Sequence, residues 1–538
     1  MEKSHFTNGF EFDVPSTVQT VCYDGVTSAE IGQDFVLPDY QPEMRKILRV
    51  APTVQPPTRF LGVGEAELAG NVCFDVLYVG GDGGLYSVAL SAPYTFRVPM
   101  EGNDRMSGER ALCLDAELTP QGMTHRLIAP RKLRLSCQLG AHVTLLGDCE
   151  TDVRGAVEAD QKLESSCLCA RALCATGEAL ELTDEIPLDV GEGEVRVIGS
   201  EGTVRVVEAR PTEEGVVCQG EVFLKILITR EGVPEPEQEG TEEMHATEGE
   251  IETVNRRISF SQTVEMPQSV AREGWEASAD GVCSDLAVRV EDGRLLCAAT
   301  VVCQAWAQGN ERVTFIRDCY ATDRLTECQM RSYLYARALG CINGNVTSGG
   351  NVDSGRSAIP GDAVPLDLSG CASLTGVVAE RGRVVLTGDC LYRMLYRTAE
   401  GEIGHGEFHL PLKYELPDGV SADGTAPSAD VRMRMLGGRA RPDGEGGWTV
   451  DAEWSIAGRI YSREQIEAVD EVRATGGESV KADGTMVICY PSAEDTLWSV
   501  AKRYRASVRD VVARNELPGA IDVAALESLA GVAFLMME

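Results

Sequence analysis

Three similar segments constrain the fold of this chain more than any other feature. Each begins with a glycine, continues with apolar side chains at alternate positions, and places a leucine at the same later offset. The segments run from Gly70 to Val79, from Gly220 to Thr229 and from Gly388 to Arg397. Alternation with a period of two is typical of a β-strand that buries one face. The sequence therefore predicts a repeated β structure.

A turn and a second strand follow each segment, and the second strand ends in a proline. The glycine and the proline are 29 residues apart in the first and third copies (70–99 and 388–417) and 47 residues apart in the second (220–267). The additional residues of the second copy match an acidic stretch at 233–252 that contains eight glutamates. We interpret this stretch as a loop at the tip of a hairpin. Its acidic residues are expected to make the protein soluble rather than to bind a basic partner.

These patterns predict a mainly β protein, with three repeated antiparallel β-rich domains and a small C-terminal β-α-α-β module. We place an N-terminal segment at 1–27, the β domains at 28–160, 161–335 and 336–474, a linker at 475–485 and the module at 486–538. The Gly-, Ser- and Asn-rich stretch from Cys341 to Ser357 is interpreted as a linker or long loop before the third domain.

The charge of the chain excludes some partners. Its 49 Lys and Arg against 84 Asp and Glu give a formal net charge of −35. An acidic surface repels phosphate backbones and anionic lipid, so we expect neither nucleic acid nor membrane insertion. No apolar run approaches the roughly 18 residues of a membrane span, and the N-terminus has no secretory signal pattern. We therefore expect a cytoplasmic protein with reduced cysteines.

No set of residues with a catalytic pattern emerges, so we expect no enzyme, no cofactor and no metal. The spacing of Cys167, Cys169 and Cys174 lacks a second ligand pair for zinc. His405, Glu407 and His409 would share one face of a strand, and we interpret that face as solvated surface rather than a metal site. No phosphate-binding loop or nucleophile elbow is present.

The last fifty residues have the pattern of a separate module. A short apolar strand over 487–490 leads to Asp495, which can cap a helix that carries Leu497, Val500 and Tyr504 on one face. The S-x-x-D pattern at Ser507 predicts the start of a second helix, and a final apolar strand over 532–537 can pair with the first.

This module resembles the LysM domain. The match rests on the D-T-L-W core at Asp495 to Trp498, on Ala501 and Tyr504, and on the later S-V-x-D and N-x-L elements. The resemblance implies a site on the module's loops and helices that binds a protein partner or a glycan. Its candidate residues are Glu494, Asp495, Thr496, Leu497, Trp498, Lys502, Arg505, Asn515 and Ile521. Glu494 replaces the usual glycine of the glycan-contacting loop. The spacing of Trp498 fits both a core side chain and a partly exposed anchor.

The repeated segments, together with the L-P-D-Y-Q-P-E stretch from Leu37, resemble the SPOCS domain of spore-coat-associated proteins. Three such domains followed by one LysM domain are similar to the SipL-like family of spore coat morphogenetic proteins. The resemblance implies a non-enzymatic sporulation scaffold whose LysM domain binds the coat-organising ATPase (SpoIVA-like). It also implies a location in the mother-cell cytosol at the forespore surface.

Two other functions stay open at this stage. The LysM-like tail could bind N-acetylglucosamine glycans of peptidoglycan, although that function requires export. A hydrolase with β domains as substrate platforms is a weaker alternative, since no acid, base or nucleophile set can be named.

Overall fold

The computed structural model describes most of the chain. The described residues are 3–7, 17–62, 65–99, 113–188, 193–232, 250–353, 359–417, 426–444, 446–476, 486–492, 494–517, 529 and 532–537. The expected acidic loop at 233–252 lies outside them except for its last three residues, as does most of the expected linker at 475–485.

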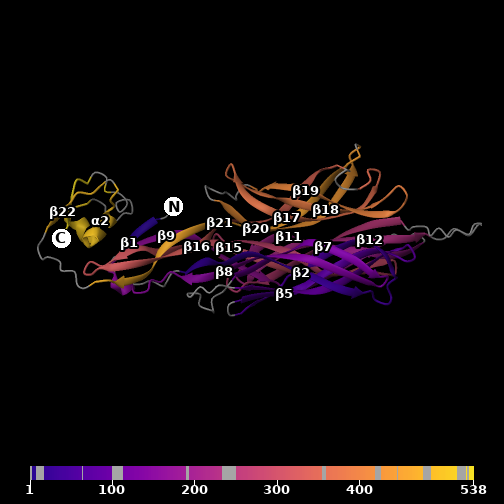
Figure 1. Cartoon of the computed structure of the whole chain (residues 1–538), viewed down its shortest axis with the longest axis horizontal. Coiled ribbons are helices and arrows are strands. Elements are labelled where there is room, and N and C mark those ends of the chain that lie inside the picture. Colours follow the sequence, from indigo (N-terminus) through magenta and orange to yellow (C-terminus); the bar gives the residue numbers. More distant parts are fainter. Residues whose placement is uncertain are drawn as a thin grey trace, which may run out of the picture.

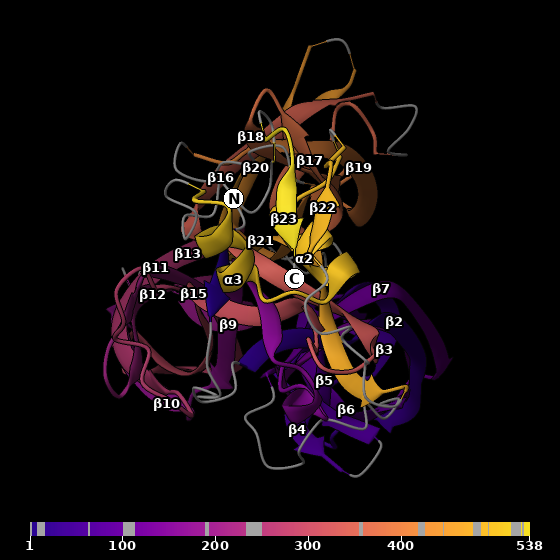
Figure 2. The ribbon, with the colours of Figure 1, turned by 90° about the vertical axis from the view of Figure 1, so that its left-hand side faces the viewer.

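The described chain is mainly β, and its paired strands are almost all antiparallel (Figure 1). An end-on view shows three lobes arranged around a common centre (Figure 2). Each lobe encloses one hydrophobic core between strands from one continuous stretch of chain. We call them the first, second and third lobes in chain order.

The first lobe packs the sheet β2-β8-β7 against β3-β5-β6, with the short β4 alongside β5. Its strands are β2 (Thr17–Val36), β3 (Met44–Val54), β4 (Thr58–Leu61), β5 (Glu65–Gly80), β6 (Leu85–Pro99), β7 (Cys113–Ala129) and β8 (Lys132–Glu150). A 3-10 turn, η1 (Ala156–Glu158), leads from this lobe to the next.

The second lobe packs a sheet centred on β15 against β11-β12-β13. Its strands are β9 (Gln161–Thr176), β10 (Leu180–Pro187), β11 (Gly193–Pro211), β12 (Gly215–Gly232), β13 (Glu250–Glu265), β14 (Glu276–Glu291) and β15 (Arg294–Tyr320). The N-terminal strand β1 (Lys3–Thr7) pairs with the edge strand β9.

The third lobe packs β16-β21-β20 against β17-β18-β19. Its strands are β16 (Thr326–Val352), β17 (Val364–Glu380), β18 (Arg383–Arg397), β19 (Ile403–Glu415), β20 (Pro427–Pro442) and β21 (Trp448–Ala474). The pairing of Tyr335 with Thr20 joins β16 to β2 of the first lobe.

The three similar sequence segments occupy equivalent places, on the middle strands β5, β12 and β18, where β12 and β18 belong to three-stranded sheets and the sheet of β5 has the short β4 as a fourth strand. The Tyr94 side chain lies against Gly70, and close approach of neighbouring backbone explains the glycine of the other two segments. A Cβ atom on Gly220 would lie 2.2 Å from the backbone oxygen of Arg205, and one on Gly388 would lie 2.4 Å from that of Ser373. Any side chain there would separate the middle strand from its edge strand.

The repeated leucines meet where the lobes converge. Leu77, Leu227 and Leu395 are all buried in one cluster that takes residues from every lobe. In each edge strand a β-bulge adds one apolar residue next to the repeated leucine: Leu48, Ile198 and, partly buried, Leu366. Alternation predicted one buried face, whereas around the repeated leucines both faces of the middle strands are buried, one in a lobe core and one at the centre.

Buried ion pairs lie beside this cluster and also join the lobes. Asp367 of β17 accepts a hydrogen bond from Arg49 of β3 at 2.6 Å, and its second oxygen lies 2.8 Å from Nζ of Lys225 on β12. Burial alone would raise the pKa of Asp367, but Lys225 and Arg49 outweigh it and hold the pKa below its usual value. One carboxylate therefore contacts a cation from each of the other two lobes.

A second buried carboxylate repeats this arrangement. Asp115 of β7 accepts hydrogen bonds from Gln304 at 3.0 Å, Trp306 at 2.9 Å and Arg432 at 3.1 Å. The first two donors belong to the second lobe and Arg432 to the third. Removing one partner from such a network leaves a buried charge unpaired, which is strongly destabilising.

The expected domain boundaries agree with the strands at two places and cut them at two others. Residue 161 is the first of β9, and residue 474 is the last of β21. The boundary at 27/28 falls inside β2, and the one at 335/336 falls inside β16. The expected linker from Cys341 is wrong as far as Val352, because β16 continues through it in register with β21. Cross-strand pairing there overrides the low β-propensity of Gly, Ser and Asn.

Neither helix within the described residues has the length and apolar character that a membrane crossing requires.

We predict that Leu227→Ala destabilises the protein by about 2–5 kcal/mol, because it opens a cavity in the cluster shared by the lobes. Leu227 is 2% exposed, whereas Leu325, in the turn between β15 and β16, is 53% exposed. Leu325→Ala is therefore the matched control and should change the unfolding free energy by less than about 0.5 kcal/mol. Chemical denaturation followed by fluorescence measures both, and equal effects would contradict a buried junction.

Candidate functional site: the C-terminal module

The C-terminal residues form two short helices and a two-stranded ribbon in the order that the sequence predicts. The elements are β22 (Val487–Cys489), α2 (Leu497–Tyr504), α3 (Val508–Arg514) and β23 (Leu535–Met537), with β22 antiparallel to β23. Leu497, Val500, Ala501 and Leu535 are buried in the small core of this module. Tyr504, expected on the same inward face, is partly exposed instead.

Thr496, rather than Asp495, caps helix α2. The Thr496 hydroxyl accepts a hydrogen bond from the Ser499 amide at 3.0 Å, and the Ser499 hydroxyl accepts one from the Thr496 amide at 2.9 Å. This reciprocal pair is a capping box. Ser507 caps α3 by accepting from the Asp510 amide, as the S-x-x-D pattern predicts.

Asp495 instead fixes the loop before α2. Its carboxylate accepts hydrogen bonds from the Ser492 amide at 2.8 Å and hydroxyl at 3.0 Å, and it also pairs with Arg503. The Ser492 amide, followed by Arg503, lowers the pKa of Asp495 to about 2. These contacts tie the loop to the far end of the helix.

Trp498 anchors the module to the tip of the second lobe. Its indole nitrogen donates to Asp318 of β15 at 2.9 Å, and its ring packs edge-on against Tyr320 with centroids 5.0 Å apart. Lys502, one turn later, places Nζ 2.6 and 2.7 Å from the two oxygens of Asp318. Trp498 is therefore a buried side chain, and Lys502 is paired within the chain.

Two further contacts extend the anchor. The Tyr320 hydroxyl donates to the backbone oxygen of Ala506 at 2.7 Å, and the Val508 amide donates to the side chain of Gln161 at 3.2 Å. Gln161 is the first residue of β9 and Tyr320 is the last of β15, so both lie at one end of the second lobe. The module is held at this end of the elongated body (Figure 1).

Some of the other predicted site residues hold the module together, and others are exposed. Leu497 is fully buried, and Asn515 bonds both the amide and the carbonyl of Met536, which ties α3 to β23. Arg505 ends α2 in a left-handed conformation with φ of 50°. Glu494 is exposed. Ile521 lies outside the described residues.

An exposed apolar face was missed by the sequence analysis. Met486, Ile488 and Tyr490 alternate with the inward side chains of β22 and are 65%, 50% and 75% exposed. Phe534, just before β23, is 47% exposed, with its ring centroid 6.5 Å from that of Tyr490. Alternation over 486–490 was the available signal, but the sequence predicted only a short apolar strand there, with no distinction between its two faces. We call these four residues the ribbon face.

A hollow of about 840 Å³ between the second and third lobes has Glu201, Lys225 and Asp367 in its lining.

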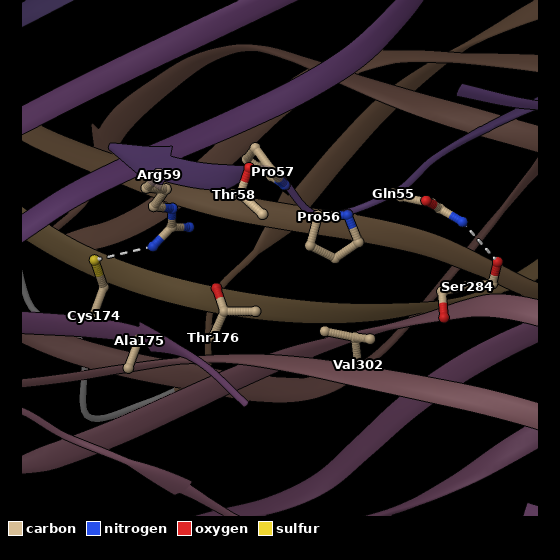
Figure 3. A pocket seen from close by; sticks show the side chains of 10 residues that line it. All are labelled: Gln55, Pro56, Pro57, Thr58, Arg59, Cys174, Ala175, Thr176, Ser284 and Val302. Carbon is tan, nitrogen blue, oxygen red and sulfur yellow. Dashed lines mark hydrogen bonds between the residues drawn. The ribbon is translucent and has the colours of Figure 1, made fainter. Parts of the chain in front are cut away.

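Another hollow, of about 590 Å³, lies between the first and second lobes (Figure 3). Its wall in the first lobe includes the short connection from β3 to β4. Gln55 donates to the backbone oxygen of Ser284 there, and Arg59 donates to the sulfur of Cys174. None of its lining residues is a histidine or a carboxylate, so it offers no general acid–base pair.

The strand β19 exposes His405, Glu407 and His409, while the alternate residues Phe408 and Leu410 are buried. Glu407 pairs with Arg393, and His409 pairs with Asp389. Within the described residues, no group of three or more His, Cys, Asp or Glu side chains is placed to hold a metal ion.

Comparisons of the chain with protein-family models, curated proteins and solved structures found no match.

We predict that Asp318→Ala loosens the module without unfolding the lobes, because it removes the acceptor shared by Trp498 and Lys502. Hydrogen bonds to a charged group contribute about 1.5–3 kcal/mol, so amide exchange in α2 should accelerate roughly tenfold to a hundredfold. Hydrogen–deuterium exchange with mass spectrometry measures it. Glu327→Ala, an exposed carboxylate on neighbouring β16, is the control, and equal acceleration in both variants would contradict the anchor.

The lowered pKa of Asp495 predicts a pH dependence. The folded pKa lies below the ordinary value, so the carboxylate stabilises the module above about pH 4, and this contribution is lost as pH falls toward 2. The melting temperature of the native module should therefore exceed that of Asp495→Asn at pH 5, and the gap should close by pH 2. Calorimetry across this range checks it, and a gap that widens in acid would contradict it.

Proposed function

We propose that this protein is a non-enzymatic scaffold of the SipL-like kind, in which the three lobes are copies of a SPOCS-type domain and the C-terminal module is a LysM-type domain. In this proposal the module binds the coat-organising ATPase (SpoIVA-like) in the mother-cell cytosol, and the body helps to encase the forespore with coat. The resemblance of the sequence motifs to the SPOCS and LysM domains suggests the family. The placement of the module supports an interaction role.

The ribbon face carries the proposal. Four large apolar side chains gather on a module of about fifty residues, and exposed clusters of this kind mark protein-interaction sites more often than scattered single residues do. Two side chains of α2 that could serve a partner, Lys502 and Trp498, are engaged with Asp318, and Arg503 of the same helix pairs with Asp495. We therefore assign the partner to the ribbon face rather than to these side chains.

Glycan binding by the module has less support. Leu497 and Trp498, which follow the loop expected to contact glycan, are both buried, and exposed Glu494 adds a carboxylate to that loop. A buried aromatic ring cannot stack on a sugar. The experiment described next therefore also measures binding to peptidoglycan.

The test is a two-arm capture experiment with the full chain. One arm offers the purified coat ATPase and the other offers purified sacculi. We predict that Ile488→Ser combined with Tyr490→Ala weakens capture by the ATPase at least about tenfold, as expected for central residues of an interface. Val157→Ser is the control, since Val157 is 71% exposed but lies on η1, outside the module.

Capture that is unchanged by the double variant would overturn the role of the ribbon face. Retention on sacculi without capture by the ATPase would overturn the scaffold and favour glycan binding. Because both substituted side chains point outward, the module should fold in the variant, and unchanged amide exchange in α2 verifies this.

A further inference from the structure

Two cysteines lie in contact beside the module's anchor. Cys319 is the penultimate residue of β15, and Cys328 is near the start of β16. Their sulfur atoms are 3.3 Å apart, and the Cys328 thiol also donates to the backbone oxygen of Cys319 at 3.1 Å. Cys319 is buried, whereas Cys328 is partly exposed and can meet a small reagent from solvent. The pair thus combines one accessible sulfur with one sheltered sulfur within reach.

Contact with the Cys319 sulfur favours a thiolate at Cys328 once the Cys328 proton leaves the Cys319 carbonyl. The hydrogen bond from Cys319 lowers the pKa of Cys328 to about 7, despite an opposing effect of burial. The Lys502 ammonium also acts to lower this pKa, and the Asp318 carboxylate acts to raise it. Thiolate is the reactive form of cysteine, so this sulfur is more nucleophilic near neutral pH than an unperturbed thiol.

Another close pair provides an internal comparison. The sulfurs of Cys167 and Cys169 are 3.4 Å apart, but both residues lie on one extended strand, β9. Residues two apart on a strand have Cα atoms about 6.6 Å apart, at the upper limit for a disulfide. Cys319 and Cys328 belong to different strands joined by a turn, which can adjust. The turn makes Cys319 and Cys328 the pair better placed to close a disulfide.

The pair is connected to the anchor through Asp318. The Cys319 amide donates to one oxygen of Asp318 at 2.9 Å, and the other oxygen accepts from Trp498. Closing a disulfide draws the sulfurs from 3.3 Å to about 2.05 Å, which must displace the chain at Cys319 or Cys328. A shift of the Cys319 amide would move the carboxylate that holds the module.

We propose that Cys328 and Cys319 form a peroxide-reactive dithiol, and that its disulfide loosens the module from the second lobe. The Cys328 thiolate attacks one oxygen of hydrogen peroxide, the O–O bond breaks, and a sulfenic acid and hydroxide form, the hydroxide taking a proton to become water. The Cys319 sulfur then attacks the sulfenic sulfur. The S–S bond forms, the S–O bond breaks, and the Cys319 proton leaves with the hydroxyl as a second water. Two thiols are oxidised by two electrons, and one peroxide is reduced to two waters.

This proposal is independent of the scaffold function, and its test uses the full chain without any partner. The reduced protein is treated with hydrogen peroxide, quenched with an alkylating reagent and digested for mass spectrometry. We expect a linked Cys319–Cys328 peptide to form at least about ten times faster than any linked Cys167–Cys169 peptide. Cys328→Ser should abolish the link, and Cys319→Ser, which keeps a hydrogen-bond donor beside Cys328, should leave Cys328 as a sulfenic acid that a dimedone probe captures.

Hydrogen–deuterium exchange on the oxidised protein tests the second half of the proposal. Exchange in α2 should accelerate severalfold on oxidation and return to its original rate with dithiothreitol, whereas Cys328→Ser should show no change. Failure to find the linked peptide would overturn the dithiol. A linked peptide with unchanged exchange in α2 would overturn its effect on the module.

Discussion

The cluster of Leu77, Leu227 and Leu395 is the contact on which the arrangement of the lobes depends. Each leucine comes from the middle strand of a different sheet, so burying one requires the other two. Two buried carboxylates, Asp367 beside this cluster and Asp115 on β7, then fix the orientation, because each is bonded to donors from both of the other lobes. Burial of apolar side chains holds the lobes together but favours no direction. The hydrogen bonds to the two carboxylates have a defined geometry, so they fix the angle between the lobes.

The position of the C-terminal module follows from this arrangement. Strands β9 and β15 run from the centre to one end of the body, where Gln161, Asp318 and Tyr320 receive helices α2 and α3. The module docks through α2 and α3, so the ribbon face around β22 and before β23 stays exposed. The module thus presents an apolar face at one end of the body.

Local patterns predicted local structure well, and contacts between distant residues could not be predicted from them. The alternation after Gly70, Gly220 and Gly388 indicated the middle strands, and the S-x-x-D pattern indicated the start of α3. Trp498 fitted both a core and an exposed role because its partner, Asp318, lies 180 residues away. Lys502 was assigned to a partner surface for the same reason. The low β-propensity of the Gly-rich end of β16 concealed a strand that tertiary pairing imposes.

The most direct test of the account is hydrogen–deuterium exchange of the full chain with and without the coat ATPase. The account predicts protection confined to the ribbon, at 486–490 and 532–537, with no change at the anchor residues of β9 and β15. Protection of the outer strands of the lobes with none on the ribbon would contradict it, since the partner would then bind the body and the module would need another role.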